Sequence, residues 1–225
     1  MIAENIRLVR ERIAKACARA GRDPAQITIV AISKNRSAEE VGEVIGAGIT
    51  DIGENKLQEA RLKADSRKLK AVRWHMVGHL QSNKVKDAVK IFDLIHSVDS
   101  EDLAQEIDKQ AAKISKVQDI LIQVNTSGEE SKFGLSPKQA IEEILKIRTL
   151  KNLSVKGLMT IAPLVDNPEK VRLYFRALRE LRDSIYQLQV TSYQLPFLSM
   201  GMSDDFEVAI EEGADIVRIG RAIYG

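Results

Sequence analysis

One pattern recurs eight times along this sequence: a short apolar run, then a polar loop and an amphipathic stretch. The apolar runs cover residues 27–34, 50–53, 72–77, 94–98, 119–125, 155–160, 196–199 and 216–219. Their length and their Val and Ile content are typical of strands, and the stretches between them have helical periodicity. No linker rich in Pro, Gly or Ser divides the chain. The pattern therefore predicts an α/β fold, a (β/α)8 TIM-like barrel with residues 1–225 in a single domain.

Local signals predict several helix boundaries. Ser37 and Glu40 have the spacing of a capping box, and Ser136 precedes a proline at the first helical position. A long helix is predicted to start at Asn167 and to run through Leu188. The helix after the second strand carries its apolar residues at Leu57, Ala60, Leu62 and Ala64.

The two ends of the chain do not fit a plain barrel. A helix over 2–20 precedes the first strand, and little chain is left for a helix after Ile219. We therefore expect the N-terminal helix to cover the junction between the last and first strands and so to close the ring.

Composition excludes several classes of protein. The net charge of +2 gives no support for a nucleic-acid partner, and no apolar run approaches the ~20 residues of a membrane span. The single Cys17 cannot form an intramolecular disulfide and suits a reducing compartment. The charged N-terminus does not resemble a signal peptide. We therefore expect a cytoplasmic protein and, without a long exposed apolar stripe, a monomer.

Lys34 ends the first apolar run. Lysine is almost never fully buried without a partner, so its place at the mouth of a buried strand has two interpretations. Either the strand ends there and the amine reaches water, or burial lowers the pKa of the amine so that it can attack a carbonyl.

Polar residues and glycines also end the other strands. They are Asn55, His79, Asn125, Thr160, Ser199 with Gly201, and Arg218 with Gly220. Because the active site of such a barrel lies at the carboxyl ends of the strands, these residues predict a binding site there, with His79 pointing toward the pocket.

The loops over 199–203 and 218–221 follow the seventh and eighth strands, a common phosphate site in this fold. Their glycines let the backbone approach an anion, and the helix expected over 203–212 directs N–H groups at it. The alternative is two ordinary turns, with Gly201 and Gly220 present only for a positive φ.

The histidines do not suggest a metal site, since no Cys or acidic cluster completes a set of ligands around His75, His79 and His96. Two of the three are expected to be satisfied structural residues. The arginines at 176, 179 and 182 suggest a solvated helix face rather than a binding surface.

A lysine opposite a phosphate site suggests a phosphorylated aldehyde, and pyridoxal 5'-phosphate fits. Arg218 is placed to face the pyridine nitrogen of that cofactor. Because a guanidinium keeps its proton, the ring nitrogen would stay unprotonated and the cofactor would be a weak electron sink.

Eight segments resemble the pyridoxal phosphate homeostasis protein family: 30–34, 53–55, 73–84, 96–99, 123–135, 157–163, 198–206 and 217–223. That family is similar to the N-terminal barrel of alanine racemase, of fold-type III. The resemblance implies a Schiff base on Lys34 and Arg218 near the ring nitrogen, with Asn55 also near the ring. It implies phosphate contacts from Ser199 and from the backbone of Gly201, Gly220 and Arg221. The chain ends at Gly225, where many members continue for a few charged residues.

Three functions remain open. The first is a carrier that binds pyridoxal phosphate without dedicated catalysis and passes it to pyridoxal-phosphate-dependent apo-enzymes. The second is a weak amino-acid racemase, which needs a base on each side of the substrate carbon, and no second, β-rich domain is present to supply the other base. The third is a lysine-dependent aldolase, for which Glu54 is the nearest carboxylate, although it looks more like a helix start. We predict no catalytic residue.

Overall fold

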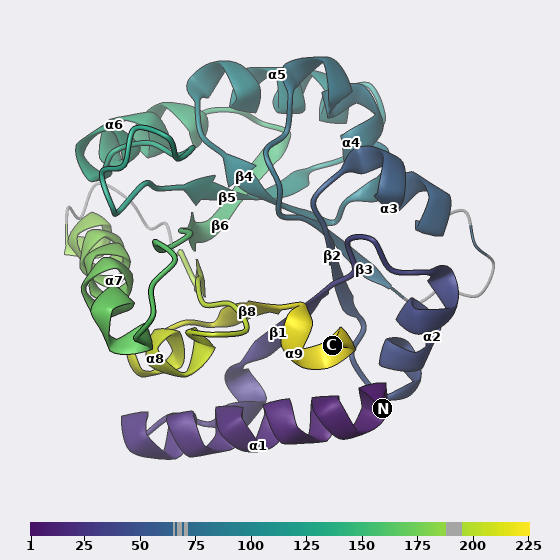
Figure 1. The fold of residues 1–225 in the computed structure, drawn as a ribbon. Coiled ribbons are helices and arrows are strands. Elements are labelled where there is room, and N and C mark those ends of the chain that lie inside the picture. The colour runs from purple at the N-terminus through teal and green to yellow at the C-terminus, as the bar shows by residue number, and fades with distance from the viewer. Residues whose placement is uncertain (65, 67–68, 70–71, 188–194) are drawn as a thin grey trace.

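The computed structural model describes residues 1–64, 66, 69, 72–187 and 195–225. Eight parallel strands close into a barrel in chain order, and β1 pairs with both β2 and β8. The strands are β1 (Thr28–Ile32), β2 (Asp51–Glu54), β3 (Arg73–Met76), β4 (Leu94–Val98), β5 (Gln118–Gln123), β6 (Leu153–Met159), β7 (Phe197–Ser199) and β8 (Ile216–Ile219). Helices surround them (Figure 1), which confirms the predicted (β/α)8 barrel.

The helices follow the strands as the alternation predicts. They are α1 (Ile2–Ala20), α2 (Ala38–Gly46), α3 (Leu57–Ala64), α4 (Val85–Ile91), α5 (Glu101–Ala112), α6 (Pro137–Ile147), α7 (Arg172–Gln187), α8 (Phe206–Glu211) and α9 (Arg221–Tyr224). Short 3-10 turns are η1 (Pro24–Gln26), η2 (Ser82–Lys84) and η3 (Pro168–Val171). The capping box of Ser37 and the cap at Ser136 are both present. The helix predicted from Asn167 begins as the turn η3, and Leu188 lies outside the described residues.

Helix α1 covers the junction between β8 and β1, as the sequence predicts (Figure 1). Ile6, Val9 and Ile13 form its buried face. The Asn5 amide donates to the carbonyl of Ile223 at 2.9 Å, which ties α1 to the short helix α9. Within the described ranges, no helix has the length and apolarity that a membrane crossing requires.

The barrel encloses a small apolar core of its own. Val30, Leu94, Leu121, Met159 and Ile216 pack inside the ring of strands, while a larger apolar cluster lies between the strands and the helices. The remaining space inside the ring holds buried polar side chains, which belong to the site described below.

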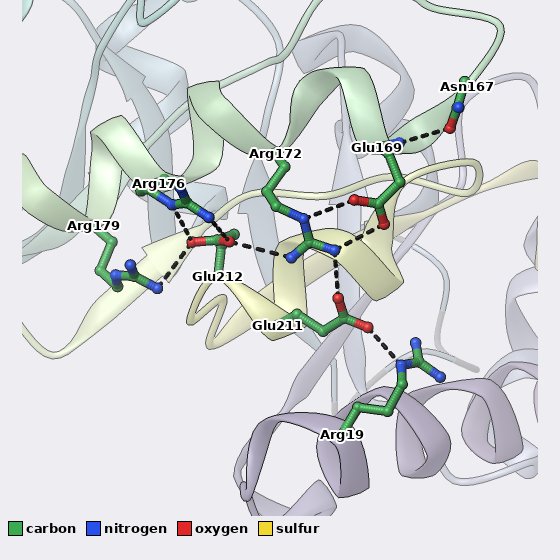
Figure 2. A network of polar contacts seen from close by, with 8 residues as sticks. All are labelled: Arg19, Asn167, Glu169, Arg172, Arg176, Arg179, Glu211 and Glu212. Carbon is green, nitrogen blue, oxygen red and sulfur yellow. Dashed lines mark hydrogen bonds and ion pairs between the residues drawn. The ribbon is translucent and has the colours of Figure 1, made fainter.

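Arginines of α7 pair with two carboxylates at the end of α8 (Figure 2). Glu212 accepts from Arg172 at 3.2 Å and Arg176 at 3.1 Å and lies 2.9 Å from Arg179, while its side chain is only 5% exposed. Glu211 links Arg172 to Arg19 of α1, with both contacts at 2.6 Å. The predicted solvated face is therefore only partly correct: the Arg176 side chain is 50% exposed, but Arg176 and Arg179 both pair with the buried Glu212. Arg182 pairs instead with Asp183 and lies 3.8 Å from Asp215.

We expect Glu212→Gln to lower the free energy of unfolding by roughly 2 kcal/mol, measured by urea denaturation at pH 7. Removing one partner of a buried pair costs about 3–5 kcal/mol, and partial exposure of the arginines reduces this. Burial of Glu212 opposes ionisation, but hydrogen bonds from Arg176 and Arg172 outweigh it and hold the pKa of the carboxyl below its usual value. The contribution of the Glu212 carboxylate to the free energy of unfolding should therefore be complete above about pH 4.3, the pKa of a glutamate in the unfolded chain. It should be lost as the pH falls through the pKa of Glu212 in the folded protein.

The matched control is Glu169→Gln, at a carboxylate that also binds Arg172 but is 60% exposed. We expect a loss below about 0.5 kcal/mol there. Equal losses in the two variants would contradict a special role for the buried acid.

Candidate binding site at the carboxyl mouth of the barrel

Strand register brings the predicted site residues together. Val30 of β1 lies opposite Arg218 of β8, and a Cβ built on Gly220 would lie 3.5 Å from the carbonyl oxygen of Ile32. On the other side of β1, the N–H of Ser33 donates to the carbonyl of Gly53 at 3.0 Å. Lys34 therefore leaves the barrel between the end of β8 and the end of β2.

The Lys34 side chain is exposed, and in the described part of the chain its amine has no hydrogen bond or ion pair. The burial required by an activated amine is thus not observed in this structure, whereas the amine is accessible. The turn before it is held firmly. Ser33 is fully buried, and its carbonyl accepts from the amine of Lys63 at 2.6 Å.

Glu54 is the last residue of β2 and is fully buried, so its prediction as a helix start was wrong. Its Oε1 accepts from the Ser33 hydroxyl at 2.5 Å and pairs with Lys63 of α3 at 2.5 Å. Its Oε2 is buried and has no hydrogen-bond partner among the described residues.

Arg218 is buried inside the barrel mouth, with 4% of its surface exposed. It donates to the Ser199 hydroxyl at 2.7 Å and to the Thr160 carbonyl at 2.8 Å. Burial lowers the pKa of its guanidinium to about 10, opposed by the charge of Asp205. At neutral pH the side chain is therefore a cation that can only donate hydrogen bonds.

The two loops predicted to bind phosphate lie side by side. The N–H of Arg218 donates to the carbonyl of Gly201 at 3.0 Å, and the N–H of Ala222 donates to the Ser203 hydroxyl at 3.2 Å. We call residues 201–203 and 220–222 the anion cradle. Within the described residues, the N–H groups of Ser203 and Gly220 have no hydrogen-bond partner. Unpaired donors from two loops suit an anion with several oxygens.

The glycines of the cradle differ in their backbone. Gly201 has a φ of +91°, and Gly220 has a φ of −111°. The alternative in which both glycines serve only a positive φ therefore applies to Gly201 alone. The Arg221 side chain points away into an ion pair with Asp204, which leaves its backbone as the part available to a ligand.

Ser199 does not face the cradle. Its hydroxyl lies inside the barrel, bonded to Arg218 and 2.9 Å from Nδ1 of His96. Ser203 is the hydroxyl that the cradle contains; the predicted loop over 199–203 includes it, but it was not among the predicted contact residues. The alternation of side chains along a strand could have predicted the direction of Ser199. A residue of β7 that lies beside Arg218 of β8 points into the barrel, as Arg218 does.

Asn55 and His79 follow the neighbouring strands β2 and β3. Asn55 is half-buried, and a Cβ on Gly78 would lie 2.3 Å from its carbonyl oxygen, so the ends of β2 and β3 touch. His79 stacks on Phe133 with ring centroids 4.0 Å apart and lies 3.6 Å from Asp99. His75 and His96 are fully buried and hydrogen-bonded, as predicted for structural histidines.

Fold and site together define a class: a parallel barrel with a free lysine beside an anion cradle and a buried arginine. The family profile of the alanine racemase N-terminal domain matches residues 2–225. The chain is 48% identical over 222 residues to the pyridoxal phosphate homeostasis protein of Aquifex aeolicus, covering 99% of this chain and 96% of that one. It is 41% identical to the Pseudomonas aeruginosa protein of the same name, covering 100% and 95%. The chain belongs to the pyridoxal phosphate homeostasis protein family.

Solved structures of similar proteins agree with this family assignment. PipY of Synechococcus elongatus, with pyridoxal phosphate (PLP) bound, is 33% identical and superposes with a TM-score of 0.87 over 100% of both chains. Alanine racemase of Clostridium difficile is 16% identical, with a TM-score of 0.77 over 99% of this chain and 59% of that one. The second likeness shows the fold alone.

Proposed function

We propose that this protein binds pyridoxal 5'-phosphate at the carboxyl mouth of its barrel and holds it as a Schiff base on Lys34. The observation that supports the proposal is the pairing of β1 with β8, because the strand end that leads to Lys34 lies beside Gly220 of the anion cradle: a Cβ on Gly220 would lie 3.5 Å from the carbonyl oxygen of Ile32. The PLP-bound structure of PipY, a full-length relative, supports the choice of ligand.

Each side chain then has a defined role. The bound group supplies an aldehyde on an electron-withdrawing ring. Lys34 holds the aldehyde carbon, while Ser203 and the backbone of Gly201, Gly220 and Arg221 hold the phosphate. Arg218 donates to the ring nitrogen and leaves it unprotonated. Asn55 and His79 line the other side of the ring.

We propose a carrier without dedicated catalysis over a racemase. Two-base chemistry needs a second proton donor opposite Lys34, and the predicted candidate Glu54 is fully buried, with its Oε1 bonded to Ser33 and Lys63. A carrier needs only an accessible lysine from which an incoming amine releases the ligand. We further propose that it acts as a monomer in the cytoplasm and delivers the cofactor to apo-enzymes.

The test is reductive trapping. Purified protein is incubated with pyridoxal phosphate and reduced with borohydride, and the adduct is mapped by peptide mass. We expect one added cofactor, on Lys34, and alanine racemisation far below the rate of dedicated enzymes. A different modified lysine would overturn the site, and rapid racemisation would overturn the carrier.

Ser203→Ala should weaken the binding of pyridoxal phosphate about tenfold or more, because a hydrogen bond to a charged group contributes about 1.5–3 kcal/mol. Equilibrium dialysis measures the affinity. The control is Ser127→Ala, which removes a hydroxyl bonded to Asn125 in the loop after β5. An unchanged affinity in Ser203→Ala would argue against the cradle as the phosphate site.

A further inference from the structure

A line of hydrogen bonds crosses the barrel interior from its carboxyl end to its amino end. Arg218 donates to the Ser199 hydroxyl at 2.7 Å, and that oxygen lies 2.9 Å from Nδ1 of His96. Nε2 of His96 lies 2.9 Å from Nδ1 of His75, whose Nε2 lies 2.9 Å from Oδ1 of Asp51. Five strands contribute one residue each, and the three middle residues have no exposed surface. We call these five residues the interior chain.

The two ends of the interior chain determine the direction of every bond. A guanidinium can only donate, so Ser199 accepts from Arg218 and has one proton to give to Nδ1 of His96. A neutral His96 then carries its proton on Nε2 and donates to His75. His75 in turn donates from Nε2 to Asp51, which as a carboxylate can only accept. Each proton has one acceptor and none is left over.

The opposite direction leaves groups unpaired. With a proton on Nδ1 of His96, the Ser199 proton has no further acceptor among the described residues. A neutral His75 would also turn an unprotonated nitrogen toward the Asp51 carboxylate. Unsatisfied groups of this kind cost about 1–3 kcal/mol each when buried.

The charges around the interior chain favour a neutral His96. Arg218 stands at one end with Asp205 nearby, and Arg73 lies 4.0 Å from Asp51 at the other. Burial first, then the charges of Arg218 and Arg73, hold the pKa of His96 well below its usual value. A second cation beside Arg218 is therefore disfavoured.

We propose that His96 and His75 are positioning residues: both are neutral with the proton on Nε2, and through Ser199 they fix the orientation of Arg218. The guanidinium is then held by Ser199 and Thr160 without a carboxylate bonded to it, so its charge stays available at the mouth. The effect on the cofactor rests on the proposed function, whereas the proton positions do not.

The first experiment uses ligand-free protein with 15N-labelled histidine, since this chain has only three histidines. A His79→Gln variant leaves the two interior rings for assignment. Long-range 15N–1H spectra at pH 7 should show two neutral rings protonated at Nε2. A proton on Nδ1 of His96, or a doubly protonated His75, would overturn the proposal. This measurement needs no substitution in the five residues of the interior chain.

The second experiment compares Asp51→Asn with Asp51→Leu. Asparagine keeps an acceptor for His75, so it should preserve the proton positions. Leucine removes the acceptor, so His75 should show a second tautomer. At saturating pyridoxal phosphate, Asp51→Leu should shift the visible band of the bound cofactor and weaken its affinity about tenfold, with wild-type values in Asp51→Asn.

If the spectra and the cofactor affinity were unchanged in Asp51→Leu, the positioning role of His96 and His75 would be overturned, whatever the stability of that variant. Failure of the proposed function is a separate result, because it would appear as a wild-type protein without an adduct on Lys34 while the histidine signals stay as expected.

Discussion

Lys34→Ala is expected to abolish the borohydride-stable adduct completely while leaving measurable binding of pyridoxal phosphate. The cradle is built from the loops after β7 and β8, and its hydroxyl and backbone donors do not include the Lys34 side chain. A few charge-assisted hydrogen bonds of about 1.5–3 kcal/mol each can retain micromolar or weaker affinity. Mass spectrometry measures the adduct, and equilibrium dialysis measures the remaining affinity.

Lys56→Ala is the matched control, because Lys56 is also an exposed lysine near the mouth, with 70% of its side chain exposed. We expect its adduct and affinity to match the wild type. An adduct that survives in Lys34→Ala would refute the assignment of the lysine. A complete loss of binding would show that the cradle does not hold the phosphate independently.

Gly201→Ala is expected to lower the free energy of unfolding by about 3–4 kcal/mol and to weaken cofactor binding. A side chain at φ +91° costs about 1–2 kcal/mol. The added Cβ would lie 2.6 Å from Cβ of Ala209 and 2.9 Å from Cα of Phe206, so α8 must move, which adds about 1–3 kcal/mol. Urea denaturation and dialysis provide the two measurements.

Gly128→Ala separates the two contributions. Gly128 also has a positive φ, +73°, but a Cβ there meets nothing within 4 Å. We expect only the backbone cost of about 1–2 kcal/mol and unchanged cofactor affinity. If Gly128→Ala and Gly201→Ala lowered the free energy of unfolding equally, the close packing of Gly201 against α8 would not explain why a glycine is needed at position 201.

The sequence alone predicted the barrel and the mouth because both depend on short-range signals. Buried parallel strands appear as continuous apolar runs, and a polar residue after each run must emerge at the same end of the barrel. The caps at Ser37 and Ser136 are equally local. The closing role of α1 followed from counting elements, since β8 has only the short α9 after it.

Side-chain direction within the mouth was a different matter. Ser199 ends β7 and Ser203 follows in the loop, and the pairing of β7 with β8 shows that Ser199 turns inward to Arg218. The accessibility of Lys34 likewise depends on what packs above the end of β1. Strand alternation could indicate the direction of Ser199, but no pattern along the chain reports what packs above Lys34.

Long-range electrostatics also lay beyond the sequence. In α3, the apolar Leu62 is 78% exposed, whereas the charged Lys63 is buried against Glu54. Likewise, Glu212 buries its charge because three arginines of α7 surround it. The sequence determined which segments are strands and helices and where their ends meet, because periodicity and capping act within a few residues. Only the tertiary structure decided which charges are buried, because a buried charge requires a partner that folding brings from a distant segment.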